Sequence, residues 1–305
     1  MRAMAYRQYG DGETLESTIM PMPTVGPGEI LVRVVRAGVN PVDWKIMSGA
    51  LDGLMDVVFP VVPGWDVAGV VVATGFDTPE FAVGDEVIAY ARKDCVQGGT
   101  FAEYVCVPVR CAAAKPRLLN WEQSAGLPLA GLTAYQMLTR LGTGGEDTVL
   151  VHGAAGGVGF LACQMARYFG ARVIGTASPR NHARLRAIGV EPVEYGDGLE
   201  ERVKGLAPQG VSVVADFVGG VLDTTRAVLR DGGRHASSAD PKVLDAGGAW
   251  LWVRPDSRDL EVLVEIADAG RLTVPVERLF DLKDLKAAFA LSRTGHVHGK
   301  VIVSV

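Results

Sequence analysis

The sequence has no long apolar run, no CxxC pair and no cluster of basic residues, and each absence excludes some classes of function. No stretch of about 18 apolar residues occurs, so we expect no membrane-spanning helix. The N-terminal segment has no apolar core of signal-peptide length, which favours a cytoplasmic protein. The net charge is −5 without a Lys/Arg run, which argues against nucleic acid or an anionic membrane as a partner.

Cysteine and histidine are few and scattered. The four cysteines are Cys95, Cys106, Cys111 and Cys163, and none forms a CxxC pair. The five histidines form no motif with them. Because zinc sites usually draw their ligands from close Cys/His pairs, we expect no metal site. The thiols are expected to be buried and reduced.

What is present indicates a folded protein of two domains. The chain has 305 residues, of which 48% are hydrophobic, and this is more than one compact core usually holds. Charged residues make up 21%, close to the usual quarter, which argues against disorder.

The pattern of hydrophobic residues changes twice along the chain. Residues 1–115 contain short runs rich in Val and Ile between Gly and Pro, as in a β-barrel-like domain. Helical spacing over 121–142 is followed by alternating strand and helix patterns, which predict a parallel sheet with helices on both faces. After a last helix over 256–270, residues 271–305 return to β-type runs, so we expect the C-terminus to fold back onto the N-terminal domain.

A glycine cluster lies between an apolar strand pattern and a helix pattern. Gly153, Gly156 and Gly159 have GxxGxxG spacing. Glycine permits a tight turn, and the start of the helix offers unpaired N–H groups to an anion. This context predicts a dinucleotide pyrophosphate site, although a turn without a ligand is the alternative. The predicted cofactor-binding turn comprises Gly153, Ala154, Ala155, Gly156, Gly157, Val158 and Gly159.

The second strand of this unit ends without the Asp or Glu that binds the ribose 2′-hydroxyl of NAD. It offers Ser178 and Arg180 instead, and an arginine fork suits a 2′-phosphate. We therefore predict NADPH rather than NADH. Tyr195, at the end of the next strand pattern, is predicted to cover the phosphate or the adenine. The alternatives are a solvated arginine at a helix start and an ordinary half-buried tyrosine.

Seven blocks of sequence, taken in order, resemble the zinc-free quinone oxidoreductases of the medium-chain dehydrogenase/reductase superfamily. The resemblance covers nearly the whole chain. The blocks are AGVNPVDWK (37–45), FPVVPGWDVAGVV (59–71), GGTFAEYVCVP (98–108), LPLAGLTAYQML (127–138), VLVHGAAGGVG (149–159), ADFVGG (215–220) and GHVHGKVIV (295–303).

The resemblance implies an α/β protein with two domains. One is a GroES-like, β-rich catalytic domain formed by both termini, at 1–115 and 271–305. The other is a Rossmann-type, doubly wound, NADP-binding domain at 116–270. The resemblance also implies a cleft where the nicotinamide meets the substrate. It further implies a homodimer that pairs the edge strands near Trp250–Val253, which would protect an apolar edge.

The differences from zinc-dependent relatives bear on the chemistry. Where those alcohol dehydrogenases place a zinc-binding Cys, this chain has Asn40, and Trp65-Asp66 stands in place of His-Glu. Alcohol oxidation then lacks its Lewis acid. Reduction of a quinone, or of a C=C bond conjugated to a carbonyl, needs only hydrogen-bond donors for the oxygen that becomes negative.

The motif NPVDWK supplies the candidate catalytic residues. Asn40 and Lys45 are predicted to donate to the developing oxyanion, with a surface role as the alternative for Lys45. Asp43 is expected to hold the local backbone. Trp44 and Trp65 are predicted to line the substrate pocket, with core packing as the alternative.

Further cofactor contacts follow from the resemblance. Thr133 is expected near the nicotinamide ribose or a phosphate, and the backbone of Phe217, Val218 and Gly219 near the cofactor. Gly299 and Lys300 are expected at the cofactor phosphates, with an exposed strand lysine as the alternative for Lys300.

These observations predict an NADPH-dependent, zinc-independent reductase of quinones or of the C=C bond of α,β-unsaturated carbonyl compounds. The proton for the α-carbon is expected from water, since no general acid is evident. One alternative is an enoyl-thioester reductase. Another is an NADPH-binding sensor or RNA-binding protein with little catalysis, although the charge balance counts against RNA.

Overall fold

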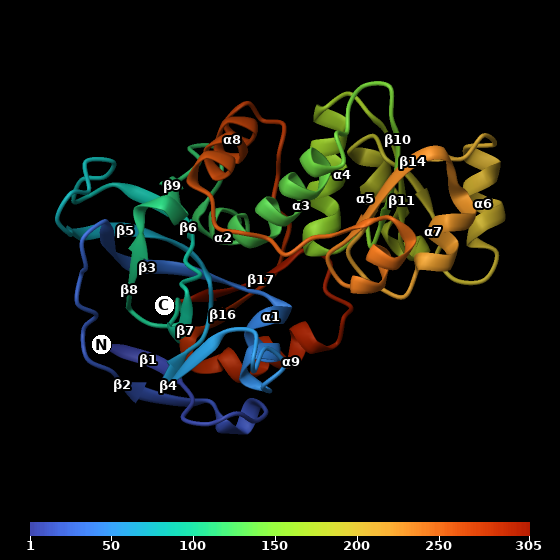
Figure 1. The fold of residues 1–305 in the computed structure, drawn as a ribbon. Coiled ribbons are helices and arrows are strands. Elements are labelled where there is room, and N and C mark those ends of the chain that lie inside the picture. The colour runs from blue at the N-terminus through green and yellow to red at the C-terminus, as the bar shows by residue number, and fades with distance from the viewer. The chain divides into compact units, whose positions relative to one another are not determined.

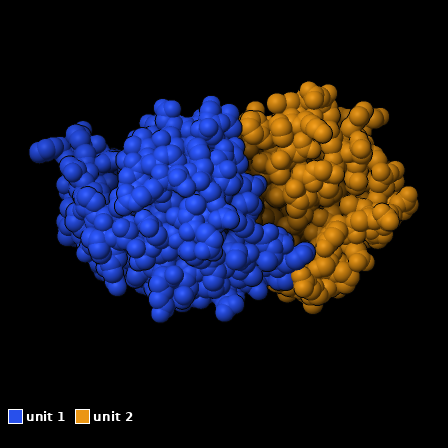
Figure 2. Space-filling view, turned by 90° about the horizontal axis from the view of Figure 1, so that it is seen from below, with its two compact units in different colours: residues 1–129, 255–305 blue, residues 130–254 orange.

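The computed structural model describes all residues, 1–305, and they form two compact units. Unit 1 comprises Met1–Leu129 and Pro255–Val305, and unit 2 comprises Ala130–Arg254 (Figures 1 and 2). Unit 1 is therefore built from both ends of the chain, as the return of β-type runs after residue 270 predicted.

Unit 2 is built on a six-stranded sheet in which all neighbouring strands are parallel. In spatial order the strands are β12 (Glu191–Val193), β11 (Arg172–Thr176), β10 (Thr148–His152), β13 (Val211–Asp216), β14 (Leu229–Ser237) and β15 (Ala249–Trp250). The chain runs outward from β10 in one direction and then, after returning to β13, in the other. This order is the predicted Rossmann-type doubly wound topology, with its switch point between β10 and β13.

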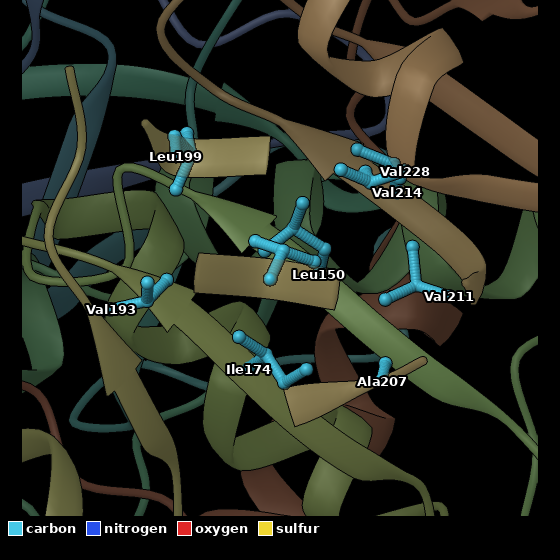
Figure 3. Packing of buried hydrophobic residues seen from close by; sticks show 9 residues of the cluster. Leu150, Ile174, Val193, Leu199, Ala207, Val211, Val214 and Val228 are labelled. Atoms are coloured by element: carbon cyan, nitrogen blue, oxygen red, sulfur yellow. The ribbon is translucent and has the colours of Figure 1, made fainter. Parts of the chain in front are cut away.

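Helices cover both faces of this sheet. They are α4 (Gly157–Tyr168), α5 (His182–Ala187), α6 (Leu199–Leu206) and α7 (Leu222–Val228), with α3 (Pro128–Arg140) leading into the unit. On one face, Leu150, Ile174 and Val214 pack against residues of α6 and α7 such as Val203 and Val228 (Figure 3). Because successive strand residues point to opposite faces, the alternate residues of β10 and β11 meet α4 on the other side.

Unit 1 contains a seven-stranded sheet in the order β16-β17-β3-β5-β6-β9, with β8 also paired to β3. These strands are β16 (Val276–Asp281), β17 (Lys300–Ser304), β3 (Glu29–Val39), β5 (Asp66–Thr74), β6 (Glu86–Tyr90), β9 (Ala112–Ala114) and β8 (Tyr104–Pro108). Two smaller sheets pair β1 (Arg2–Ala5) with β2 (Glu16–Ile19) and β4 (Asp56–Val62) with β7 (Cys95–Gly98). The C-terminal strand β17 lies antiparallel beside β3, which brings the two ends of the chain into one sheet.

Unit 2 is shorter at both ends than the domain at 116–270 that the sequence indicated. Residues 116–129 and 255–270 belong to unit 1. The helix α2 (Trp121–Ala125) contacts β3 and β5, and α8 (Ser257–Asp268) contacts β9. The helical pattern over 121–142 is divided between α2 and α3 by a break before Pro128, whose ring nitrogen has no N–H to donate.

A buried polar cluster joins three distant segments of unit 1. Asn40 begins the helix α1 (Pro41–Met47), Asp66 begins β5, and Lys300 begins β17. The Asn40 Nδ2 donates to Asp66 Oδ2 at 2.9 Å, and the Lys300 Nζ donates to Asn40 Oδ1 and lies 3.6 Å from Asp66 Oδ2. The other Asp66 oxygen accepts from the Leu129 N–H at 2.8 Å. All three side chains are buried, and the Asp66 carboxylate compensates the charge of the Lys300 ammonium inside the protein.

Asp43 lies at the edge of this cluster and holds the start of α1. Its Oδ2 accepts from the Asn40 backbone N–H at 2.8 Å, which confirms its predicted role on the local backbone. Its Oδ1 has no hydrogen-bond partner. Burial raises the pKa of Asp43 to about 8, and the nearby Asp66 adds to this, whereas the Asn40 N–H and Lys300 oppose it. Asp43 therefore carries a proton at neutral pH.

The raised pKa predicts that Asp43 makes stability depend on pH. The folded chain keeps the Asp43 proton up to about pH 8, whereas the unfolded chain loses it near the ordinary value of 3.8. The contribution is thus fully present below about pH 4 and is lost as the pH rises toward 8, by at most about 1.4 kcal/mol per pH unit. In Asp43→Asn the amide oxygen still accepts from Asn40.

We expect the free energy of unfolding of Asp43→Asn, relative to the unaltered chain, to improve by at least about 1 kcal/mol between pH 5 and pH 8. Urea denaturation at several pH values measures this difference. Asp52→Asn is the matched control, because Asp52 is an exposed carboxylate that accepts from the Tyr9 hydroxyl. Parallel pH profiles for Asp43→Asn and the unaltered chain would mean that Asp43 is already ionised in the folded state.

Candidate functional site

The glycine cluster forms the turn between β10 and α4, as the sequence predicted. Gly153 has a left-handed backbone, with φ of +72°, which favours glycine. Its N–H donates to Thr176 Oγ1 at 3.0 Å, and its carbonyl accepts from Gly156 N–H at 3.0 Å. Gly156 is the N-cap of α4, so the first N–H groups of that helix point out of the turn without helical partners.

The contacts around these glycines show why the turn lacks side chains. A Cβ at Gly159 would lie 2.2 Å from the Gly153 carbonyl oxygen, so α4 can pack on the turn only with glycine there. A Cβ at Gly153 would lie 2.6 Å from Val218 Cγ1. At Gly156 only a backbone oxygen lies near, at 3.3 Å, and Gly156, Gly157 and Val158 are partly exposed. A cradle of backbone at a helix N-terminus fits a dinucleotide pyrophosphate.

The residues that were predicted to bind the adenosine part of the coenzyme lie just past the ends of the neighbouring strands β11 and β12. Thr176 of β11 pairs with Val193 of β12, so Ser178 and Tyr195 each follow the carboxyl end of neighbouring strands. The Ser178 hydroxyl accepts from Asn181 Nδ2 at 3.1 Å. Arg180 is exposed and has no carboxylate partner, and Tyr195 is 57% exposed. These side chains are open to a ligand and include one free cation.

The loop after β13 is held by a carboxylate that sequence reasoning did not single out. Asp216 accepts from the N–H groups of Val218 and Gly219 at 2.9 and 3.0 Å, and from Ser237 Oγ at 2.6 Å. Val218 remains 55% exposed next to Gly153. Asp216 and Ser237 thus hold the backbone of the loop in place. In the sequence, the feature that could have identified them is a polar residue at the end of an apolar strand.

Two other polar residues of unit 2 are enclosed. His152, at the end of β10, pairs in register with Asp216 and is buried. Burial lowers the pKa of His152, although Asp216 opposes this, so the imidazole is neutral. Thr133 is only 5% exposed on α3.

In unit 1, the two predicted oxyanion donors differ in access. Asn40 is 2% exposed, and its amide group is bonded to Asp66 and Lys300. Lys45 is exposed and has no ion-pair partner, and its Nζ lies 5.7 Å from the centroid of the Trp44 ring.

The two predicted pocket tryptophans also differ. Trp44 is half-buried, and its Nε1 donates to Ser292 Oγ at 3.2 Å. Trp65 is 5% exposed and packs edge-on against Tyr90, with the ring centroids 5.9 Å apart. Trp65 is thus packed in the core, which is the alternative that the sequence left open for it.

The structure places Gly299 and Lys300 differently from what the resemblance implied. Lys300 is neither at a surface nor free for a phosphate, because it is buried against Asp66. A Cβ at Gly299 would lie 2.4 Å from the Pro275 carbonyl oxygen, which itself accepts from the Lys300 N–H at 2.8 Å. Gly299 therefore serves the close approach of two backbone segments.

One expectation about the thiols is wrong. Cys106, Cys111 and Cys163 are buried, but Cys95 on β7 is exposed. The short strand pairs only with β4, so its outward residues face solvent.

Two negative findings concern metals and membranes. No group of three or more His, Cys, Asp or Glu side chains is arranged to hold a metal ion. None of the helices has both the length and the apolar character needed to cross a membrane.

Comparisons with known proteins agree with this architecture. Residues 26–117 match the alcohol dehydrogenase GroES-like domain family, and residues 191–303 match the zinc-binding dehydrogenase family. Over 99% of its length, the chain is 33% identical to the chloroplastic NADPH-dependent alkenal/one oxidoreductase of Arabidopsis thaliana, of which it covers 79%.

Solved structures give the same result. The quinone oxidoreductase from Coxiella burnetii superposes with a TM-score of 0.88 at 31% identity, over 100% of this chain and 99% of that one. A structure described as an NAD-dependent alcohol dehydrogenase superposes with a TM-score of 0.90 at 31% identity, over 100% of both chains. Because these similarities extend along the whole chain, it belongs to the medium-chain dehydrogenase/reductase superfamily of NAD(P)H-dependent oxidoreductases.

Proposed function

We propose that the protein is an NADPH-dependent reductase of quinones or of the C=C bond of α,β-unsaturated carbonyl compounds. The observation that carries the proposal is the bare glycine turn at the switch point of the unit 2 sheet, with the free Arg180 past the next strand. The activities in the names of the Arabidopsis thaliana and Coxiella burnetii relatives support the acceptor classes.

In this proposal, unit 2 holds the coenzyme. The turn 153–159 binds the pyrophosphate through backbone N–H groups, and the loop 217–219 borders it. Ser178 and Arg180 bind the 2′-phosphate, beside the exposed ring of Tyr195. When bound, the coenzyme supplies a hydride to an electrophilic carbon.

The residues of NPVDWK act on the oxygen of the acceptor. Lys45, whose ammonium is exposed, donates to the oxygen that becomes negative as the carbon is reduced. Asn40 is enclosed, so we assign it a positioning role: it links Asp66 and Lys300 and starts the helix that carries Lys45. The α-carbon proton comes from water.

Loss of reduced-nicotinamide absorbance tests the function directly. We expect turnover of NADPH with quinones and short enones, and little turnover of crotonyl-type thioesters. Lys45→Ala should lower kcat on enones by at least about tenfold, whereas Lys283→Ala, an exposed lysine paired with Asp281, should leave it unchanged. No turnover with any acceptor, while NADPH still binds, would contradict the reductase proposal.

The choice of NADPH rests on Arg180 and has its own test. Arg180→Ala removes a charge-assisted contact, so KM for NADPH should rise about tenfold while KM for NADH is unchanged. Arg186→Ala is the matched control, because Arg186 is an exposed arginine further along the same segment. Equal use of both coenzymes by the unaltered protein would contradict the binding of a 2′-phosphate by Ser178 and Arg180, without bearing on the fold.

We also propose a homodimer formed through β15. This short strand lies at the edge of the unit 2 sheet, and Trp252, just beyond it, is 41% exposed. An unpaired apolar edge favours association.

We expect sedimentation to give twice the chain mass of 32.3 kDa, and Trp252→Glu to give the monomer. Val83→Glu, at an exposed valine of unit 1, is the control. A monomeric unaltered chain would exclude this interface.

A further inference from the structure

One arginine of unit 2 binds the loop that carries Tyr195. Arg202 lies on α6, and its Nε donates to the carbonyl oxygen of Glu194 at 3.0 Å. Its Nη2 donates to the carbonyl oxygen of Gly196 at 3.3 Å. These two carbonyl groups belong to the residues immediately before and after Tyr195. The guanidinium group therefore holds the backbone on both sides of this tyrosine.

The start of α6 directs the Arg202 side chain toward this loop. Gly198 is the N-cap of the helix, and the Arg202 N–H donates to the Gly198 carbonyl at 3.2 Å. Because the side chains of a helix lean toward its N-terminus, a long side chain in the first turn reaches back over the residues before the helix. A Cβ at Gly198 would lie 3.0 Å from Arg202 Nη1, so glycine leaves room for the guanidinium group.

The loop needs this support because its own residues restrain it little. Gly196 and Gly198 both have a left-handed backbone, with φ of +89° and +74°, and glycine has more conformational freedom than any other residue. Residues 194–198 are all exposed, and the side chain of Tyr195 is 57% exposed. The direction of the Tyr195 ring therefore depends on the backbone that carries it, which Arg202 holds.

The loop lies beside the segment that is proposed to bind the 2′-phosphate. The carbonyl of Val193, at the end of β12, accepts from the N–H of Ala177 at 2.9 Å, one residue before Ser178. Both segments follow the carboxyl ends of parallel strands, where such sheets bind their ligands. An aromatic ring at this edge can stack on the flat face of an adenine.

We propose that Arg202 is a positioning residue for the coenzyme, because it holds the ring of Tyr195 against the adenine of the bound dinucleotide. This role rests on the proposed function and adds to it a residue that does not itself touch the coenzyme. The planar fork of arginine donates to two carbonyl oxygens at once, whereas the ammonium group of lysine is a compact point charge. Since both coenzymes carry the adenine, Arg202 acts on NADPH and NADH alike, whereas Arg180 acts on NADPH alone.

The test measures the dissociation constants of NADPH and NADH by isothermal titration calorimetry, with the full-length protein and no acceptor. Arg202→Gln should raise both constants about fivefold. Arg202→Lys, which keeps the charge but not the fork, should raise them about twofold. The matched control is Arg172→Gln, because Arg172 Nη2 donates to the Leu206 carbonyl at the other end of α6, at 2.9 Å. It should leave both constants unchanged.

A double variant separates positioning of the ring from a general effect on unit 2. Tyr195→Ala removes the ring and should also raise both constants about fivefold. If Arg202 acts through the ring, adding Arg202→Gln to Tyr195→Ala should change them by less than about 1.5-fold. Effects of the two substitutions that multiply, or an effect of Arg202→Gln that is confined to NADPH, would overturn the proposal.

Binding requires no turnover, so a failed reductase assay does not affect this test. Binding of both coenzymes that Arg202→Gln leaves unchanged would overturn the role of Arg202 alone. An unaltered chain that binds neither coenzyme would overturn the proposed function together with this role.

Discussion

The buried contact of Lys300 with Asp66 and Asn40 is the interaction on which unit 1 depends. The partners of Asn40 lie 26 and 260 residues away in the chain. Loss of one partner would leave a buried charge without compensation, which costs about 3–5 kcal/mol. The cluster therefore holds the first residue of β17 against β5, and with it the pairing of β17 and β3.

The same cluster sets where α1 begins. Asn40 is the N-cap of that helix, and Asp43 closes the cap from the third helical position. Pro41 occupies the first helical position, where its missing N–H has no cost. Lys45 follows on this short helix, so its exposure is a consequence of the buried residues behind it. In unit 1, the buried carboxyl groups thus hold the backbone that presents the exposed cation.

Unit 2 uses a carboxylate in a comparable way. Asp216 accepts from two N–H groups of the loop after β13 and from the Ser237 hydroxyl of β14. This loop places Val218 against Gly153, at the turn between β10 and α4. Parallel strands end at one edge of the sheet, so residues distant in sequence are gathered there by topology. The turn needs glycine because its neighbours are backbone atoms.

The features that depend on local spacing can be read from the amino-acid sequence alone. The glycine turn, the alternation that builds the parallel sheet, the return of the C-terminus to the β-rich unit and the role of Asp43 at the start of α1 could all be predicted. Each of these follows from periodicity, from glycine and proline, or from residues three positions apart. The family blocks added the acceptor class, which no periodicity contains.

The positions of side chains that are far apart in the sequence depend on the three-dimensional fold. It buried Lys300 against Asp66, exposed Cys95 on a short strand, enclosed Asn40, and assigned α2 and α8 to unit 1. The physical reason is that burial and charge pairing depend on contacts between segments separated by tens or hundreds of residues. A lysine or cysteine has the same appearance in the sequence whether its neighbours in space are water or a buried carboxylate.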